Sequence, residues 1–276
     1  MAEKTYLIFH DVNGKPDLLK EILLEKADNY ICLGGLIKSE VRTHKELDLS
    51  LECLAIMASE PYCMLMAGDA ENRLIDKVRD AKKGSLKEKD SSLAERLVSI
   101  KKEHLKPLFN GIIGPLTKIE TPYPNRILFN TFLPNAFDIQ LRDTDSFISS
   151  VEKKVAYSDL NELDDQTLTK NYGPLFRQII NYLSKKERSN LFFSGGREEC
   201  IVWQRGLENA IASTISLNNH SNRIFKKLIP GSIVLPGSAR KGFFCKYDHE
   251  EGVLELIYDD TLDQRFSRLA KHYRGA

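Results

Sequence analysis

Short apolar runs alternate with longer amphipathic segments over the first 70 residues. Runs rich in β-branched and aromatic residues cover 5–9, 30–33 and 62–66, and each stops at a turn rich in Gly, Asp or Asn. Between them, Pro16 opens a segment with Leu and Ile at helical spacing, and 44–59 repeats that spacing. This order of elements predicts parallel βαβ units with helices on the sheet.

The rest of the chain predicts a charged helical region followed by a series of short strands. Helical spacing continues over about 72–108, with one candidate break at 82–90. Strands are expected at 115–120, 126–133, 190–193, 200–204, 232–235, 242–247 and 253–258.

Three further segments complete the expected organisation. Amphipathic helices are expected over 172–186 and 261–273, and the polar, acidic stretch 138–165 predicts a loop with a short helix. We therefore expect a single domain over 1–276, with a charged helical excursion at about 72–108 and a polar excursion at about 138–165.

Composition narrows the class of protein. The 276 residues are 42% hydrophobic and 29% charged, which is typical of a folded domain, and 40 Lys and Arg against 39 Asp and Glu give no case for a general nucleic-acid binder. No apolar run approaches the roughly 20 residues that cross a membrane. Five Cys without a CxxC spacing indicate reduced, mostly buried thiols, so we expect a cytoplasmic protein without a membrane partner.

Five predicted strands end in turns of similar chemistry. In open α/β sheets, ligands bind at the carboxyl ends of the strands. The turns read HDVNG at 10–14, LGG at 33–35, AGDAEN at 67–72, FSGGR at 193–197 and LPGSAR at 235–240. Glycine at a tight strand exit also has a purely conformational explanation, so the order of the turns is more informative than any one of them.

In that order the chain resembles the calcineurin-like metallophosphoesterases, especially their compact bacterial phosphodiesterase and dinucleotide-hydrolase-like branch. That family reads DxHG, GD, GNHD, a lone His, GHxH and NPGS. This chain has, at the matching places, YLIFHDVNG, YICLGG, MLMAGDAEN, RILFNTFLP, LFFSGGR and IVLPGSAR. The resemblance covers nearly the whole chain and implies a metallophosphoesterase-like four-layer α/β/β/α sandwich.

The resemblance also implies that most of the family's metal ligands have been replaced in the first three motifs. Asp11 matches the family's first Asp, but Asn13 stands where the family has His. Gly35 stands at the bridging Asp, and Asp69 stands at the Asn of GNHD. The last position of that motif carries Glu71 in place of Asp, and the catalytic His between them is an Ala.

The later motifs have changed in the same direction. The lone middle His falls at Asn130 or at the Thr that follows it, and the two His of GHxH are Gly195 and Arg197. Pro, Gly and Ser of NPGS are intact, so Ser238 keeps the family residue. A site without an imidazole or a bridging carboxylate is a poor host for two metal ions about 3.5–4 Å apart.

These replacements leave two interpretations of the cleft carboxylates and two of Arg197. One weakly held Mg²⁺ or Mn²⁺ could use the oxygen atoms of Asp11, Asp69 and Glu71 as ligands. We favour the other interpretation, in which these residues are solvated strand-end residues or helix N-caps and no cofactor is resident. Arg197 is a further hypothesis, since its guanidinium could pair with Asp11 and replace the missing metal charge. An exposed loop arginine is the alternative for that residue.

We therefore expect a catalytically degenerate metallophosphoesterase-like protein that acts as a binding, scaffold or regulatory protein. Its expected partner is a protein or a small nucleotide-like ligand. The alternative is a metal-dependent phosphoesterase or phosphodiesterase with an altered single-metal site, and a ligand sensor without chemistry is a third hypothesis. None of the six His has a convincing metal partner in the sequence: His10 is expected in the core, and His44, His104 and His249 on the surface.

Overall fold

The computed structural model describes a set of ranges separated by gaps. These are residues 5–60, 63–66, 68–85, 91–105, 116–120, 126–130, 190–195, 200–205, 210–214, 223–229 and 231–259. The polar excursion at 138–165, the expected helices at 172–186 and 261–273, and Arg197 lie outside the described residues.

The first part of the chain forms the alternating elements that its apolar pattern predicts. In order they are β1 (Thr5–Phe9), α1 (Pro16–Ile22), β2 (Asn29–Cys32), α2 (His44–Ser59) and β3 (Cys63–Leu65). Pro16 stands at the first position of α1, and the hydroxyl of Thr43 caps α2 by accepting a hydrogen bond from the Glu46 N–H. The three strands pair in parallel, with β2 between β1 and β3. The predicted βαβ arrangement is confirmed.

The charged region forms three short helical elements. They are α3 (Asp69–Lys82), α4 (Ser91–Ser99) and the 3₁₀ helix η1 (Lys102–Leu105). Helix α3 begins three residues before the predicted start at residue 72, and its end at Lys82 agrees with the predicted break at 82–90. The residue that caps α3 is Gly68, so the prediction that Asp69 is the N-cap is wrong by one residue.

Most of the residues that the structure describes after residue 115 are in strands. They are β4 (Leu116–Glu120), β5 (Arg126–Asn130), β6 (Asn190–Ser194), β7 (Ile201–Arg205), β8 (Ala210–Thr214), β9 (Arg223–Lys227), β10 (Ile233–Leu235), β11 (Phe243–Asp248) and β12 (Val253–Tyr258). A short 3₁₀ helix, η2 (Ala239–Lys241), lies between β10 and β11. The sequence pattern predicted all of these strands except β8 and β9.

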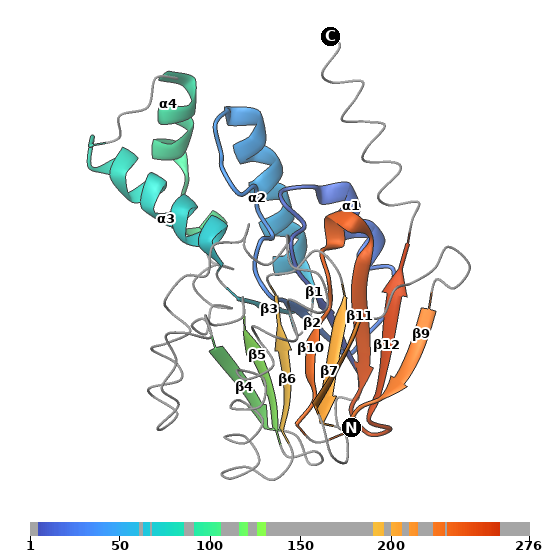
Figure 1. Ribbon diagram of the computed structural model, residues 1–276. Coiled ribbons are helices and arrows are strands. Elements are labelled where there is room, and N and C mark those ends of the chain that lie inside the picture. The colour runs from blue at the N-terminus through green and yellow to red at the C-terminus, as the bar shows by residue number, and fades with distance from the viewer. Residues whose placement is uncertain are drawn as a thin grey trace, which may run out of the picture.

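The strands form two six-stranded sheets. The first has the order β3-β2-β1-β11-β12-β9, and the second has the order β4-β5-β6-β10-β7-β8. Figure 1 shows helices α1 to α4 gathered on one side of the molecule, with the strands of both sheets on the other. Strands β8 and β9 are each at an edge of their sheet, where a strand needs fewer apolar residues, which explains why their patterns were too weak to predict.

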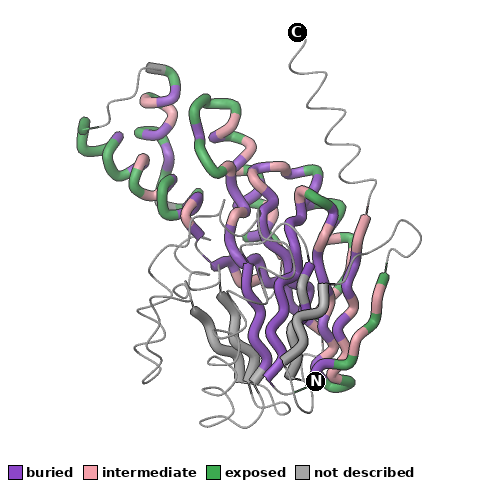
Figure 2. The backbone as a smooth tube through the Cα atoms, in the orientation of Figure 1, coloured by how far each residue is buried: buried purple, intermediate pink, exposed green. Residues whose placement is uncertain are grey.

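Two hydrophobic clusters hold these layers together. One joins the helices to the first sheet, and includes Leu7 and Phe9 of β1 with Leu18 of α1 and Leu54 of α2. The other lies between the sheets, and here alternate β1 residues such as Ile8 face residues of the second sheet such as Phe193. The central strands are accordingly buried along their length, while the outer faces of α2, α3 and α4 are exposed (Figure 2). The predicted α/β sandwich is confirmed.

Three smaller observations bear on the sequence-based expectations. All five Cys are free thiols, and four of them are buried. His10 is buried as expected, but His249 is also buried, so the expectation that it lies on the surface is wrong; its ring meets the edge of Tyr6. Within the described residues, no helix combines the length and the apolar character that a membrane crossing requires.

Candidate functional site

The residues singled out by the sequence lie where the parallel strands of both sheets end. Asp11 and Gly35 follow β1 and β2, and Asp69 begins the helix after β3. In the second sheet β5, β6 and β10 run parallel, so Asn130, Gly195 and Ser238 stand at or just after their carboxyl ends. A hydrogen bond of 2.6 Å from the Ser238 hydroxyl to Oδ2 of Asp11 joins the loops of the two sheets.

The loop after β1 has an unusual backbone. Asp11 and Asn13 have positive φ angles of 60° and 55°, a conformation that Asp and Asn tolerate better than other side chains. Their N–H groups donate to the carbonyl oxygens of Gly34 and Gly35, at 3.0 and 2.8 Å. The Asn13 side-chain oxygen accepts a hydrogen bond of 2.9 Å from the Ser39 N–H, so this loop is fastened along the loop that follows β2.

Asp11 is paired with an arginine that the sequence analysis did not single out. Oδ2 of Asp11 accepts a hydrogen bond of 2.8 Å from Nε of Arg240 as well as the one from Ser238. Asp11 is only 9% exposed, and the Arg240 side chain is about one-third exposed. A guanidinium beside a buried carboxylate forms a charge-assisted hydrogen bond. The signal in the sequence was an arginine two residues after the intact Ser of the PGS motif.

Glu71 is fully buried at the third position of α3, and backbone amides surround its carboxylate. Oε2 accepts from the N–H groups of Gly68 and Gly35, at 2.9 and 3.2 Å. Oε1 accepts from those of Leu36 and Ile37, at 2.8 and 3.3 Å. Burial raises the pKa of the Glu71 carboxyl group, and these hydrogen bonds oppose the rise. Both carboxylate oxygens are thus used to hold the loops after β2 and β3 together.

Gly35 occupies the bridging position of the resembled family, and a side chain there would be strained and crowded. Its φ angle is +66°, in the region that favours glycine. A Cβ added to it would lie 3.0 Å from Cα of Asp11 and 3.2 Å from the Asp11 N, so the Asp11 backbone would have to shift by a few tenths of an ångström to admit one. The close approach of the two loops therefore disfavours a side chain at this position, and this chain lacks the carboxylate that the resembled family has there.

The remaining predicted site residues differ in how far the structure places them. Asp69 is partly exposed on the first turn of α3, where its carboxylate lies 3.8 Å from the Arg73 guanidinium, a surface ion pair of little energetic weight. Gly195 is buried just after β6, and Asn130 is the last residue of β5. Arg197 lies outside the described residues, so its hypothesised pairing with Asp11 stays a prediction.

The donors at these strand ends can be compared with what a paired metal centre needs. Such a centre requires a bridging carboxylate and several nitrogen or oxygen ligands that are open to the ions. Here Gly35 offers no side chain, both Glu71 oxygens accept backbone hydrogen bonds, and Asp11 lies against a fixed positive charge. In the ranges that the structure describes, no three His, Cys, Asp or Glu side chains form a group that could hold a metal ion. The described donors do not fit a paired centre.

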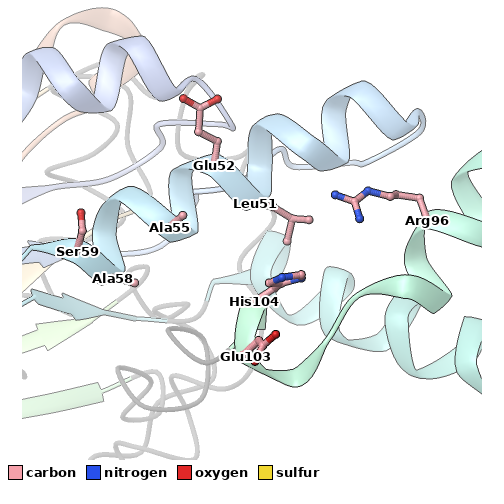
Figure 3. A pocket seen from close by; sticks show the side chains of 8 residues that line it. All are labelled: Leu51, Glu52, Ala55, Ala58, Ser59, Arg96, Glu103 and His104. Atoms are coloured by element: carbon pink, nitrogen blue, oxygen red, sulfur yellow. The ribbon is translucent and has the colours of Figure 1, made fainter.

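A separate cavity of about 580 Å³ lies between α2, α4 and η1, and it includes none of the strand-end residues. Leu51, Ala55 and Ala58 form its apolar side along α2, and Arg96 and His104 approach from the other side (Figure 3). The Arg96 guanidinium is bonded to Asp48 at 2.8–2.9 Å, so its charge is already compensated. This cavity is distinct from the site at the strand ends.

The chain was compared with family models, curated proteins and solved structures. No family model matches the chain, and no curated protein matches it. Among solved structures, a metallophosphoesterase from Sphaerobacter thermophilus is similar, with a TM-score of 0.52 and 13% identity, over 97% of this chain and 94% of that one. A phosphoesterase from E. coli, Yfce, matches with a TM-score of 0.34 and 12% identity over 88% of each chain.

The similarity to the Sphaerobacter thermophilus structure extends over almost the full length of both chains. At 13% identity, this structural similarity indicates the fold and gives no information on the chemistry. The chain therefore has the calcineurin-like metallophosphoesterase fold.

Proposed function

We propose that this chain is a catalytically degenerate protein of the metallophosphoesterase fold that works by binding, as a scaffold or regulatory protein, and not by hydrolysis. The observation that carries the proposal is the state of Glu71. A carboxylate that accepts four backbone hydrogen bonds in a buried setting has no oxygen left for a metal ion without breaking the loop structure around it.

The residues that replace the family's metal ligands give a second argument for the same proposal. Hydrolysis in this fold requires a metal pair that activates water and stabilises the developing charge. Gly35 supplies no carboxylate and Asp11 is paired to Arg240, so the described strand ends form a surface held by hydrogen bonds between protein groups. Such a surface suits recognition, because it keeps its shape without a bound ion.

The alternative hypothesis, a phosphoesterase with one metal ion on Asp11, Asp69 and Glu71, is separated from this proposal by a turnover experiment. Purified full-length chain would be incubated with bis(p-nitrophenyl) phosphate and Mn²⁺ or Mg²⁺, beside an Asp11→Ala variant. We expect both proteins to release nitrophenol at the rate of the metal ion alone. Metal-dependent turnover that Asp11→Ala abolishes would establish the enzyme instead.

A binding protein must have a ligand, and melting curves can show whether that ligand is a nucleotide or a protein. We propose a small nucleotide-like ligand or a protein partner at the strand ends. A ligand that binds only the folded chain raises the apparent melting temperature by mass action. Melting curves with mono- and dinucleotides would favour the first class if the midpoint rises with concentration, whereas an unchanged midpoint at millimolar nucleotide would leave the protein partner.

We also propose that the protein is located in a reducing compartment such as the cytoplasm. All five thiols are unpaired, and burial raises the pKa of Cys53, Cys63 and Cys200 to about 12. Thiols held in the protonated form are poor nucleophiles and resist disulfide formation.

A further inference from the structure

We propose that the Arg240 guanidinium is the resident cation of this site and occupies the place beside Asp11 that a metal ion would need. The inference deepens the proposed function, on which it rests, by naming the group that keeps metal ions out. Nε of Arg240 lies 2.8 Å from Oδ2 of Asp11, and the same oxygen accepts the Ser238 hydroxyl at 2.6 Å. Both donors converge on one carboxylate oxygen of a side chain that is 12% exposed.

Backbone hydrogen bonds and a tight turn hold Arg240 beside Asp11. Arg240 is the middle residue of η2, whose first N–H, that of Ala239, donates to the His10 carbonyl oxygen at 2.9 Å. The turn before it depends on Gly237, which has a φ angle of +83° and no room for a Cβ, since one would lie 2.6 Å from Cβ of Phe243. The residue before Asp11 and the residue before Arg240 are thus hydrogen-bonded, so the ion pair forms between two fastened segments.

Electrostatics then explains how an arginine excludes a metal ion. A divalent cation bound to Asp11 would lie within a few ångströms of a guanidinium that carries a full positive charge at any accessible pH. A cation bound at Oδ2 would also compete with the two hydrogen bonds that this oxygen accepts. Removing the guanidinium removes the repulsion and uncovers a nearly buried carboxylate. We therefore expect loss of Arg240 to raise the affinity of the Asp11 carboxylate for a divalent cation.

The experiment is a Mn²⁺ titration of the full-length chain followed by electron paramagnetic resonance, which reports free Mn²⁺. The natural chain, Arg240→Ala and Arg240→Gln would be compared, with Arg79→Ala as the matched control. Arg79 is an exposed arginine paired with Asp76 on α3, away from the strand ends. We expect both Arg240 variants to bind one Mn²⁺ at least about tenfold more tightly than the natural chain and the control.

Two further variants assign the effect to the right pair. Adding Asp11→Asn to Arg240→Gln should abolish the gained Mn²⁺ binding, and Arg240→Lys should leave it absent, because the charge is retained. Equal Mn²⁺ affinity of the natural chain and both Arg240 variants would overturn the proposal. So would a gain that appears in Arg197→Ala and not in the Arg240 variants, since Arg197 would then be the resident cation.

A stability readout keeps the inference testable apart from the proposed function. Without metal, Arg240→Gln should lower the melting temperature, and Mn²⁺ should restore it in the variant while leaving the natural chain unchanged. A variant that melts at the temperature of the natural chain would contradict the ion pair. Turnover of a phosphodiester by the natural chain would refute the proposed function, whereas the Mn²⁺ affinity of the variants decides the role of Arg240 in either case.

Discussion

Glu71 illustrates at the scale of one residue how the chemistry of a position depends on what surrounds it. The sequence places a carboxylate at the end of a metal-binding motif, and that alone suggests a ligand. In the structure, the same carboxylate accepts hydrogen bonds from two loops, and no described side chain competes for it. The donors are backbone N–H groups, which every residue except proline carries, so no sequence pattern could have identified them.

Replacing Glu71 tests this structural role. In Glu71→Gln, the side-chain NH₂ group would face backbone N–H donors, and buried amides would lose their acceptor. We expect the free energy of unfolding to fall by about 3 kcal/mol, measured from urea denaturation. Glu103→Gln, at a mostly exposed carboxylate on η1, is the matched control and should be neutral. A Glu71→Gln variant as stable as the natural chain would show that the carboxylate does not hold the loops.

Asp11 and Arg240 show why contacts between distant residues escape a sequence analysis. The sequence identified Asp11 and Ser238 through the motifs around them, but the arginine hypothesised to pair with Asp11 was Arg197, with an exposed loop position as the alternative. Arg240 is 229 residues away from Asp11 along the chain. Only the pairing of the sheets, which brings the loop after β10 against the loop after β1, makes the two side chains neighbours.

At the scale of elements, local pattern and structure agree best where strands are central and helices are amphipathic. The bounds of β1 and α2 match their predictions residue for residue, because each presents a continuous set of apolar positions to the core. Strand β9 alternates exposed and half-buried residues and carries three basic side chains among its five, so its pattern has little apolar character. Edge position, which is a tertiary property, accounts for the missed strand.

The loop after β2 gives a prediction at this scale, since two glycines with similar φ angles have different surroundings. Gly35 and Gly84 have φ angles of +66° and +69°, but a Cβ at Gly84 would meet nothing within 4 Å. We expect Gly84→Ala to cost about 1 kcal/mol of unfolding free energy from backbone strain alone. Gly35→Ala should cost about 1–3 kcal/mol more, because the Cβ presses against the Asp11 backbone.

Urea denaturation of both glycine variants beside the natural chain measures this difference. Equal losses at the two positions would mean that the loop after β2 can move away from Asp11. In that case the lack of room for a side chain at Gly35 would not be a fixed property of the folded protein.

For the molecule as a whole, the two-sheet arrangement and the parallel first units could be predicted from the order of motifs and apolar runs. The state of the site could not, because it depends on three contacts between loops: Ser238 with Asp11, Arg240 with Asp11, and Glu71 with the amides after β2. Each joins segments that become adjacent only when the sheets have formed. The residue types at the strand ends were readable from the sequence, and their partners were not.

The core between the sheets contains one feature that bears on global stability. Tyr247 is fully buried there, its ring lies 5.7 Å from that of Phe193, and its hydroxyl has no hydrogen-bond partner among the described residues. Burial accordingly raises the pKa of this phenol. A buried hydroxyl without a partner lowers stability, since it has lost its hydrogen bonds to water.

Tyr247→Phe should therefore raise the free energy of unfolding, by about 1 kcal/mol, in thermal or urea denaturation. Tyr30→Phe is the matched control, because the Tyr30 hydroxyl accepts a hydrogen bond from the Ala27 N–H and its removal should bring no gain. A clear loss of stability in Tyr247→Phe would reveal that the hydroxyl is satisfied in the folded protein.

The central claim is that these strand ends cannot assemble a pair of metal ions. The most direct measurement is the metal content of the full-length chain, purified from cells grown with added manganese and dialysed without chelator, by inductively coupled plasma mass spectrometry. The account predicts far less than one Mn, Fe or Zn per chain. Two metal ions per chain, lost in Asp11→Ala, would contradict it.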